Sequence, residues 1–320
     1  MIPKTMKAVV LTEPTLAENV VLSDVSVPQV RPGWVLVKVK AFGLNHSEQI
    51  LRLSEIQADY INRPIIPGIE CVGEIVDPSD SHFQKGEKIA ALMGGMGRSF
   101  NGSYAEYVLL PTSHVFSVQT DLSWTQMAAV PETWFTAWGS LFACLNLKES
   151  DTLLIRGGTC ALGYVAMQIA KSMGCKVIAT THKENKLPLL KEADKAVLDT
   201  GTLAGTFQGV TKALELVGPK TLRDTLRCME KGGIVCNTGI LGGVYTLNGF
   251  DPIKEIPGGV YLTGFFSNNP TQRTMTDIFS FIDSHRIKPN IGAVYSFDMI
   301  STALFDMDHH KVDGKIVVTM

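Results

Sequence analysis

The sequence predicts an α/β protein that combines a small β-barrel with a doubly wound parallel sheet. Two observations predict this class. Residues 1–125 hold short β-branched runs interrupted by Pro and Gly, and the residues after Thr152 alternate between strand and helix patterns. The chain has 320 residues, of which 45% are hydrophobic and 19% are charged, so it is long enough to bury two cores.

Turn residues interrupt the first part of the chain at Pro14, Pro28 and Pro32–Gly33. The β-branched runs between such turns are typical of strands, and many short strands in succession favour a barrel. The predicted strands are Met6–Leu11, Val20–Val27, Trp34–Ala41, Gly73–Val76, Lys88–Leu92 and Gly102–Leu110.

From Ser123 to Leu147 the pattern is helical, and strands and helices then alternate. This alternation predicts a doubly wound parallel sheet. A last helix is expected over Thr271–His285, and a closing strand over Lys315–Thr319 could return to the first part. The predicted strands of the sheet are Thr152–Arg156, Lys176–Thr181, Lys195–Leu198, Lys212–Leu216, Gly233–Asn237 and Tyr261–Phe266.

The segment Asp151–Thr181 predicts half of a nucleotide-binding unit: a strand, a glycine turn, a helix that ends at Gly174, and a second strand. Such a turn directs backbone N–H groups and a helix N-terminus at a pyrophosphate. Aligned as GxGxxG, the turn has Cys160 where the middle glycine belongs. An ordinary α/β turn without a ligand is the alternative. The tract predicted to bind the nucleotide is Gly157, Gly158, Thr159, Cys160, Ala161, Leu162 and Gly163.

The end of the second strand bears on which nucleotide binds. An NAD site usually has Asp or Glu there to hold the ribose 2′-hydroxyl. Here the strand ends Thr181–His182–Lys183, with Lys186 close behind, and Glu184 stands past the tip. Two lysines without a carboxylate at the tip favour NADPH over NADH. Alternatively, Lys183 and Lys186 belong to the solvated first turn of a helix.

Composition narrows the classes of partner. A net charge of −2 and a pI near 6.4 give no electrostatic reason to expect nucleic acid or an anionic membrane. The N-terminal residues lack the apolar core of a signal peptide, and we expect a soluble cytoplasmic protein.

No CxxC pair is present, so reduced, buried thiols are expected rather than disulfides or a zinc knuckle. The six cysteines are Cys71, Cys144, Cys160, Cys175, Cys228 and Cys236.

Further motifs occur in a characteristic order: MKAVVL, PGWVLVKVKAFGLNHSE, PIIPGIECVGEI, NGSYAEYVLL, AAVPETWFTAWGSL, the unit at 151–181, ALELVG, GGIVCNTGILGG and GKIVV. Together they resemble the medium-chain dehydrogenase/reductase superfamily, in its zinc-independent quinone oxidoreductase (zeta-crystallin-like) branch. The resemblance implies a GroES-like barrel from residues 1–125 and 268–320, a Rossmann domain from 126–267 and an active site in the cleft. It also implies a homodimer, for which Val260–Ser267 is a candidate sheet edge, although the run could equally be an interior strand.

The resemblance argues against a metal. Zinc-binding members use Cys, His and a second Cys as catalytic ligands. This chain has Asn45 at the first position and Ile69 at the second, although Glu70 remains, and the third position falls near Pro131–Thr133. Met93–Gly102 leaves no room for a structural zinc lobe. We therefore predict no metal site, because Asn and Ile cannot build the N/S tetrahedron that zinc needs.

The resemblance implies that Asn45 and Thr136 face the nicotinamide and act in catalysis, and Tyr60 or solvent could supply the proton. Without a metal, an electron-poor acceptor is expected: a quinone or similar conjugated carbonyl, with an alkenal/enone double bond as the alternative. A nucleotide-binding protein with little catalysis is a third possibility, favoured by Cys160. Phe42, Trp134 and Phe265 could form an apolar cleft. Further residues implied to bind the cofactor are Thr238, Gly239, Ile240, Leu241, Phe265, Phe266 and Ser267.

Overall fold

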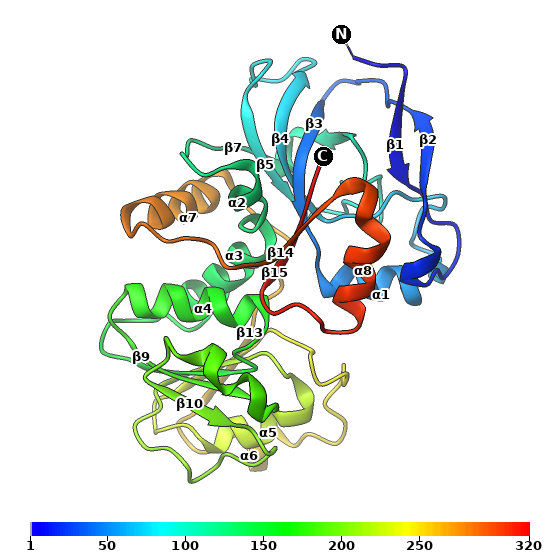
Figure 1. The fold of residues 1–320 in the computed structure, drawn as a ribbon. Coiled ribbons are helices and arrows are strands. Elements are labelled where there is room, and N and C mark those ends of the chain that lie inside the picture. The colour runs from blue at the N-terminus through cyan, green and yellow to red at the C-terminus, as the bar shows by residue number, and fades with distance from the viewer. Residues whose placement is uncertain (1) are drawn as a thin grey trace. The chain divides into compact units, whose positions relative to one another are not determined.

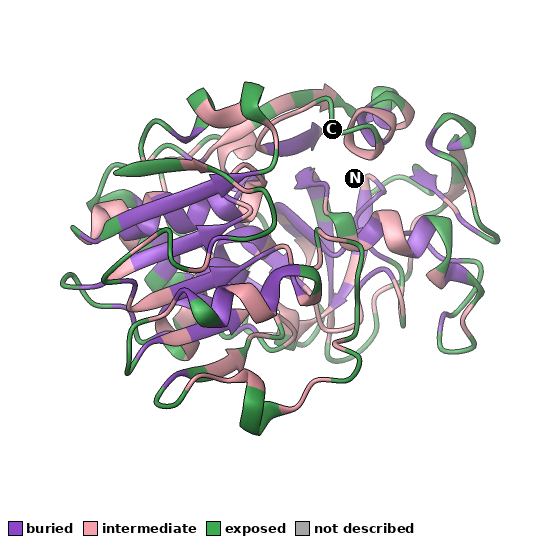
Figure 2. Cartoon of the chain, turned by 90° about the horizontal axis from the view of Figure 1, so that it is seen from below, coloured by how far each residue is buried: buried purple, intermediate pink, exposed green. Residues whose placement is uncertain are grey.

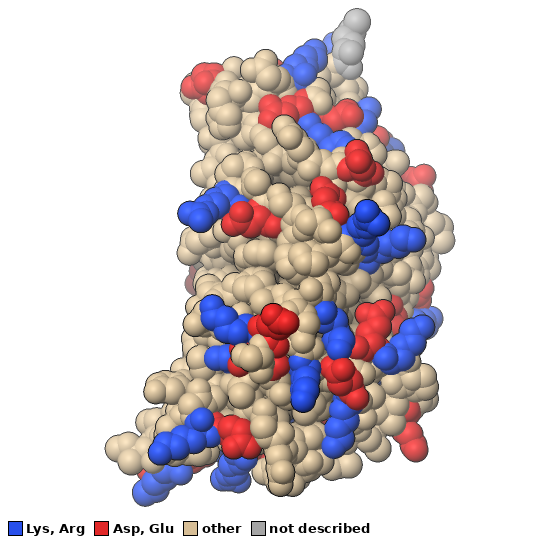
Figure 3. Space-filling view, turned by 90° about the vertical axis from the view of Figure 1, so that its left-hand side faces the viewer, with Lys and Arg blue, Asp and Glu red and all other residues tan. Residues whose placement is uncertain are grey.

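The computed structural model describes residues 2–320, which fold into two compact units (Figure 1). The barrel unit comprises Met1–Phe135 and Asn268–Met320, and the sheet unit comprises Thr136–Ser267; Met1 itself lies outside the described residues. Each unit has its own hydrophobic core. In the described part of the chain, no helix is long and apolar enough to cross a bilayer. On the face drawn in Figure 3, acidic and basic side chains are intermixed.

The strands of the barrel unit pair antiparallel, except that β14 lies parallel to β15. β1 (Thr5–Val9) pairs with β2 (Leu22–Ser26), and a larger sheet has the order β14-β15-β3-β4-β5-β7, with β6 also paired to β3. The last strand, β15, lies antiparallel to β3, with Val317 opposite Gly43. The strands of this sheet are β3 (Trp34–Gly43), β4 (Glu70–Asp77), β5 (Lys88–Leu92), β6 (Tyr107–Pro111), β7 (Val115–Ser117), β14 (Ile291–Ser296) and β15 (Lys315–Thr319).

Helices cover the barrel strands. Among them, α2 packs against β3, β4 and β15. The barrel unit therefore includes α2 and continues to Phe135, whereas the sequence placed the boundary after residue 125. The helices that lie wholly in this unit are α1 (His46–Leu53), α2 (Trp124–Ala128), α7 (Gln272–Ser284) and α8 (Ile300–Asp308), and α3 (Pro131–Trp138) crosses the boundary.

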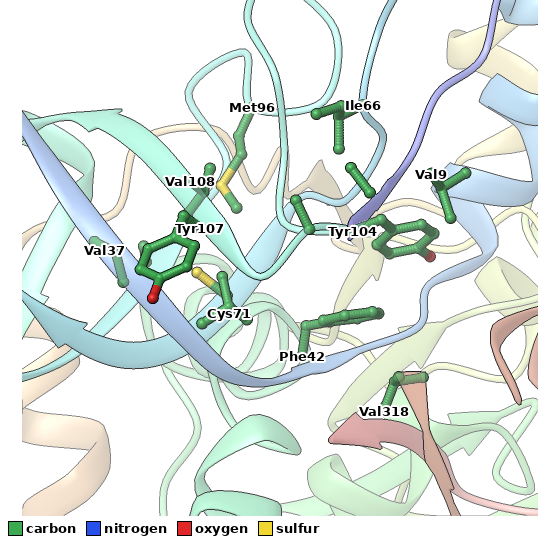
Figure 4. Packing of buried hydrophobic residues seen from close by; sticks show 14 of the residues in the cluster. Val9, Val37, Phe42, Ile66, Cys71, Met96, Tyr104, Tyr107, Val108 and Val318 are labelled. Atoms are coloured by element: carbon green, nitrogen blue, oxygen red, sulfur yellow. The ribbon is translucent and has the colours of Figure 1, made fainter. Parts of the chain in front are cut away.

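The core of the barrel unit includes aromatic side chains among its aliphatic ones (Figure 4). Phe42 stacks on Tyr104 with ring centroids 4.7 Å apart, and Phe297 meets Phe42 edge-on at 5.9 Å. Phe42 and Trp134 are both fully buried. Phe42 therefore packs within the barrel core, and neither side chain is exposed to line the apolar cleft that the sequence suggested.

The sheet unit is a parallel sheet with the strand order β10-β9-β8-β11-β12-β13, doubly wound as the sequence predicts. Its central strands are buried on both faces (Figure 2), which is why they read as continuous apolar runs. The order reverses between β8 and β11, and ligands of such sheets bind outside the carboxyl ends at this point. Its elements are β8 (Thr152–Arg156), α4 (Ala161–Ser172), β9 (Lys176–Thr181), β10 (Lys195–Leu198), β11 (Lys212–Glu215), α5 (Pro219–Arg227), β12 (Ile234–Asn237), α6 (Pro252–Glu255) and β13 (Tyr261–Gly264).

Candidate functional site

A buried lysine organises the polar centre of the barrel unit. Lys315, the first residue of β15, has a side chain that is only 3% exposed. Its ammonium Nζ lies 2.6 Å from Glu70 Oε1, donates to Asn45 Oδ1 at 2.6 Å and donates to Thr133 Oγ1 at 2.9 Å. These three contacts use all three N–H donors of a lysine. A single cation thereby joins β15 to the start of β4, to the loop after β3 and to α3.

Glu70 supplies the negative charge of this cluster. Its carboxylate is fully buried and accepts hydrogen bonds from Asn45 Nδ2 at 2.9 Å and from the Glu132 backbone N–H at 2.8 Å. Gly43 makes room for the pair, because a Cβ at this position would overlap the Lys315 side chain and approach Glu70 Oε1 to 2.5 Å. The glycine that ends β3 is therefore required by the cluster.

Asn45 also begins helix α1. It forms a capping box with Glu48: the Glu48 carboxylate accepts from the Asn45 N–H at 2.7 Å and from the Ile69 N–H at 2.8 Å. Burial raises the pKa of Glu48 to about 7, against the hydrogen bond from Ile69, which lowers it. The loop that carries Asn45 is thus fixed from two sides, by Glu48 through its backbone and by the Lys315–Glu70 pair through its side chain.

These residues do not fit a zinc ion. Asn45 and Ile69 offer no thiolate or imidazole, and Thr133, at the third expected position, offers only a hydroxyl. The Lys315 ammonium contacts two of these positions, Asn45 and Thr133, so positive charge is already present there. Over residues 2–320, no group of three or more His, Cys, Asp and Glu side chains is arranged to hold a metal.

Tyr60, which the sequence offered as a proton donor, is 63% exposed, and its hydroxyl donates to Glu55 Oε1 at 2.8 Å. This hydrogen bond raises the pKa of Tyr60. Arg98 binds the same Glu55 carboxylate and also the backbone oxygen of Ser47 at 3.1 Å. The local contacts of Tyr60 are therefore those of a surface anchor.

In the sheet unit, the glycine turn leaves β8 with Gly157 at φ +94°, a conformation that favours glycine. The Gly157 N–H donates to Thr180 Oγ1, and the Gly158 N–H donates to the Thr180 backbone oxygen at 2.7 Å, so the turn lies along the end of β9. A Cβ at Gly163 would come within 2.6 Å of the Gly158 oxygen. The close approach of α4 to the turn, which the fingerprint requires, is present.

Cys160 has a structural role in this turn. It is the N-cap residue of α4, and its Sγ accepts from the Gly163 N–H at 3.3 Å. Burial raises the pKa of the Cys160 thiol. The thiol therefore acts as a neutral cap. The backbone of Ala161 and Leu162 follows directly in the first turn of α4.

The tip of β9 carries the residues that the sequence assigned to nucleotide choice. The Thr159 hydroxyl lies 3.4 Å from that of Thr181, and the Lys183 N–H donates to Thr181 Oγ1 at 3.3 Å. Lys183 precedes a 3-10 helix over Glu184–Leu190 that contains Lys186, and both lysines are half-buried. The structure therefore brings the turn and the tip of β9 together.

A second buried cation beneath this edge was missed by sequence reasoning. Arg156, the last residue of β8, is fully buried and binds both carboxylate oxygens of Asp199, at 2.7 and 2.9 Å. It also binds Asp224 at 2.7 Å. Asp199 follows β10, and its N–H donates to the Thr181 oxygen, so a carboxylate does stand beside the tip of β9. Arg156 neutralises that carboxylate from inside the fold.

The third predicted stretch lies at the ends of β12 and β13. The Thr238 hydroxyl lies 2.9 Å from that of Ser140, and a Cβ at Gly239 would overlap the backbone of Leu216. Ser140 in turn donates to the Thr136 backbone oxygen at 2.7 Å. After Thr238 and Gly239, the loop continues through Ile240 to Leu241, whose side chain is 48% exposed. These contacts place the segment from Thr238 to Leu241, which the sequence predicted to bind the cofactor, at the carboxyl edge of the sheet.

Phe265 and Phe266 behave differently. The Phe265 ring packs so closely on Gly139 that a Cβ there would overlap the ring, whereas Phe266 is 79% exposed and Ser267 is half-buried. Of the three aromatic residues expected to form an apolar cleft, only Phe265 lies at a partly exposed position.

Comparisons with known proteins agree with this architecture. Residues 31–120 match the family model described as "Alcohol dehydrogenase GroES-like domain", and residues 161–284 match the one described as "Zinc-binding dehydrogenase". The quinone oxidoreductases of Rattus norvegicus and Homo sapiens are 27% and 26% identical over 314 residues. Both alignments cover 93% of this chain and 92% of the relative.

Solved structures show the same fold. The crystal structure of AibC has a TM-score of 0.88 at 25% identity and covers 99% of this chain and 96% of its own. The structure of mycobacterial Rv1454c complexed with NADPH has a TM-score of 0.84 at 24% identity, with 98% and 100% covered.

The chain belongs to the medium-chain dehydrogenase/reductase superfamily, a class of nicotinamide-dinucleotide-binding oxidoreductases with a GroES-like domain and a Rossmann-like domain. Within that superfamily it falls in the quinone oxidoreductase-like branch, as the sequence indicated.

Proposed function

We propose that this protein is a zinc-independent, NADPH-dependent cytoplasmic oxidoreductase whose acceptor is a quinone or a similar conjugated carbonyl compound. The observation that carries the proposal is the cluster around Asn45, which offers hydrogen-bond donors and a buried cation but no zinc ligand set. A simple alcohol needs a metal to acidify its hydroxyl. A quinone or enone spreads the incoming charge over its own π system, so hydrogen-bond donors suffice.

The glycine turn and the start of α4 would hold the pyrophosphate, because their tight backbone approach leaves no room for side chains. Thr181, Lys183 and Lys186 would hold the 2′-phosphate. The binding of Asp199 by Arg156 supports this choice, since an unpaired carboxylate beside the tip of β9 would repel a phosphate. When bound, NADPH supplies a hydride.

As the acceptor takes up the hydride at carbon, an electron pair moves to its oxygen. The Asn45 amide N–H would donate to that oxygen and stabilise the developing charge. A proton from water then completes the reduction, because the Tyr60 hydroxyl is bound to Glu55 and its raised pKa makes it a weak acid.

The first experiment is a fluorescence titration of the purified protein with NADPH and NADH. We expect NADPH to bind at least about tenfold more tightly, a difference of about 1.4 kcal/mol. Equal affinities would contradict the assignment of the two lysines. Consumption of NADPH with a panel of quinones and enones then tests the acceptor. Tight binding without turnover would favour a nucleotide-binding protein with little catalysis, in which Cys160 replaces the middle glycine of the turn.

We further propose a homodimer through the edge of the parallel sheet. β13 is the last strand of the sheet order, and Tyr261 on it is 61% exposed. An exposed strand edge offers unpaired backbone groups to a second copy. Light scattering after size exclusion should give twice the chain mass of 34.8 kDa, and Tyr261→Lys should shift it towards the monomer. A monomeric wild type would contradict the proposal.

A further inference from the structure

Asn45, Glu70 and Thr133 come from three different elements of the barrel unit and share one partner, the Lys315 ammonium. Within this cluster exposure is unequal. Glu70 is fully buried and Lys315 and Thr133 are each 3% exposed, whereas Asn45 is half-buried. Only Asn45 can therefore pass an effect of the buried cation to a bound molecule.

We propose that Lys315 is a positioning residue that orients and polarises the Asn45 amide, so that an internal ammonium performs the electrostatic task for which other enzymes use a metal. The inference rests on the proposed function, because it assigns Asn45 as the donor to the acceptor oxygen. It goes beyond the proposed function by giving Lys315 a role, which neither NADPH binding at the glycine turn nor the choice of acceptor assigns.

The orientation follows from opposite charges on the two sides of the amide. Asn45 Oδ1 accepts from the Lys315 ammonium at 2.6 Å, and Nδ2 donates to Glu70 Oε1 at 2.9 Å. Rotating the amide by half a turn would place its NH₂ group against the ammonium and its oxygen against the carboxylate. Both contacts would then be repulsive, so a single orientation is stable.

The polarisation follows from the bonding of an amide. An asparagine side chain has two N–H donors, and the Glu70 contact uses one of them. The cation on Oδ1 draws electron density through the conjugated C–N bond, which makes the remaining N–H a stronger donor. The Glu70 carboxylate on the other N–H opposes this effect in part, but the ammonium contact is the shorter of the two, 2.6 Å against 2.9 Å. A donor strengthened in this way is most effective when the acceptor oxygen becomes negative.

A merely structural role predicts different behaviour. If the ion pair only joined β15 to β4, its removal would lower stability and leave the turnover of the folded fraction unchanged. The proposed role predicts a fall in kcat that exceeds any change in NADPH affinity, since the residues that would hold the pyrophosphate and the 2′-phosphate belong to the sheet unit and are not altered. The two roles are therefore separable by experiment.

The test compares Lys315→Met with the double variant Lys315→Met/Glu70→Gln. The single variant leaves the Glu70 carboxylate buried without its cation and is at risk of misfolding. The double variant removes both charges and keeps an acceptor for the Glu132 N–H. The matched control is Lys311→Met, which breaks the ion pair with Asp306 (3.2 Å) in the same unit.

Three quantities are measured on each variant: the dissociation constant of NADPH, kcat and KM with a quinone that the wild type reduces, and the side-chain amide NMR signal of Asn45. An Asn45→Asp variant, which lacks the signal, identifies it. We expect the double variant to lose about 10- to 100-fold in kcat, less than removal of a whole oxyanion donor, and to lose much less than that in NADPH affinity. Its Asn45 signal should move towards that of a free amide, and the control should match the wild type.

A folded double variant with kcat within twofold of the wild type would overturn the inference and leave the proposed function intact. An unchanged Asn45 signal would also overturn it, because the contact with Lys315 would then be absent in solution. A wild type that binds NADPH but reduces no quinone or enone would overturn the proposed function and the catalytic part of the inference together. That result is recognised before any variant is made, and the NMR signal still decides whether Lys315 holds Asn45.

Discussion

Glu48→Gln isolates the pH dependence of one buried carboxyl group. Glu48 is 2% exposed, and burial raises its pKa from the ordinary 4.5 to about 7. The folded state therefore binds the proton more tightly than the unfolded state, so the stabilisation is complete below pH 4.5 and is lost as the pH rises through 7. With 1.36 kcal/mol per pKa unit, the loss between pH 5 and pH 8 is about 2.5 kcal/mol. The amide that replaces the carboxyl group does not titrate, so the variant lacks this loss.

The assay is urea unfolding at pH 5, 6, 7 and 8, followed by tryptophan fluorescence. Trp34, Trp124 and Trp134, three of the four tryptophans, lie in the barrel unit with Glu48. The measured quantity is the free energy of unfolding of the wild type minus that of the variant.

The subtraction is needed because other buried groups also make the free energy of unfolding depend on pH. Burial lowers the pKa of His114, which changes stability with pH in the sense opposite to Glu48, and raises the pKa of Glu215. Both groups are present in the wild type and in the variant, so they cancel. A difference that stays constant within about 0.5 kcal/mol across this range would refute the reasoning about burial.

Substitutions at three positions test the sheet unit. Arg156→Met leaves two carboxylates without their cation and should lower the free energy of unfolding by about 3–5 kcal/mol in urea; a loss under about 1 kcal/mol would contradict the reasoning. Gly163→Ala places a Cβ 2.6 Å from the Gly158 oxygen and should weaken NADPH binding at least about tenfold, by titration. Cys160→Ser should keep the helix cap and be about 1 kcal/mol more stable than Cys160→Ala in thermal unfolding. Equal stability of Cys160→Ser and Cys160→Ala would show that the cap contributes nothing.

The strands of the sheet unit were predictable almost to the residue. β8, β9 and β10 begin and end as the sequence indicated. For β8 and β9 the reason is that buried parallel strands are continuous apolar runs, whereas β10 is an edge strand and is largely exposed. β14 was missed. Its sequence, IGAVYS, is short, contains glycine and alternates between half-buried and exposed positions, so no apolar run identifies it.

The candidate site was predictable where it is local in sequence and hidden where it is not. The glycine turn and Asn45 stand in short motifs, so they could be found. Lys315 is 270 residues from Asn45, and a lysine at the start of a strand is usually solvated, so its burial had no local signal. Arg156 likewise reads as an ordinary strand end, and its partner Asp199 is 43 residues away. Only the return of β15 to β3 brings the first pair together.

Net stability alone does not explain why Lys315 and Arg156 are buried. Lys315 supports the loop of Asn45, and Arg156 lies under the turn that follows β8. Burying an ion pair costs about as much desolvation energy as it returns, and apolar side chains of similar volume often serve stability equally well. An apolar residue cannot hold an amide in one orientation, however, nor draw the Asp199 carboxylate inward from the tip of β9. We infer that these cations are kept for the geometry they impose. Replacing a whole ion pair by neutral residues should therefore cost more function than stability, whereas removing one partner alone should cost both.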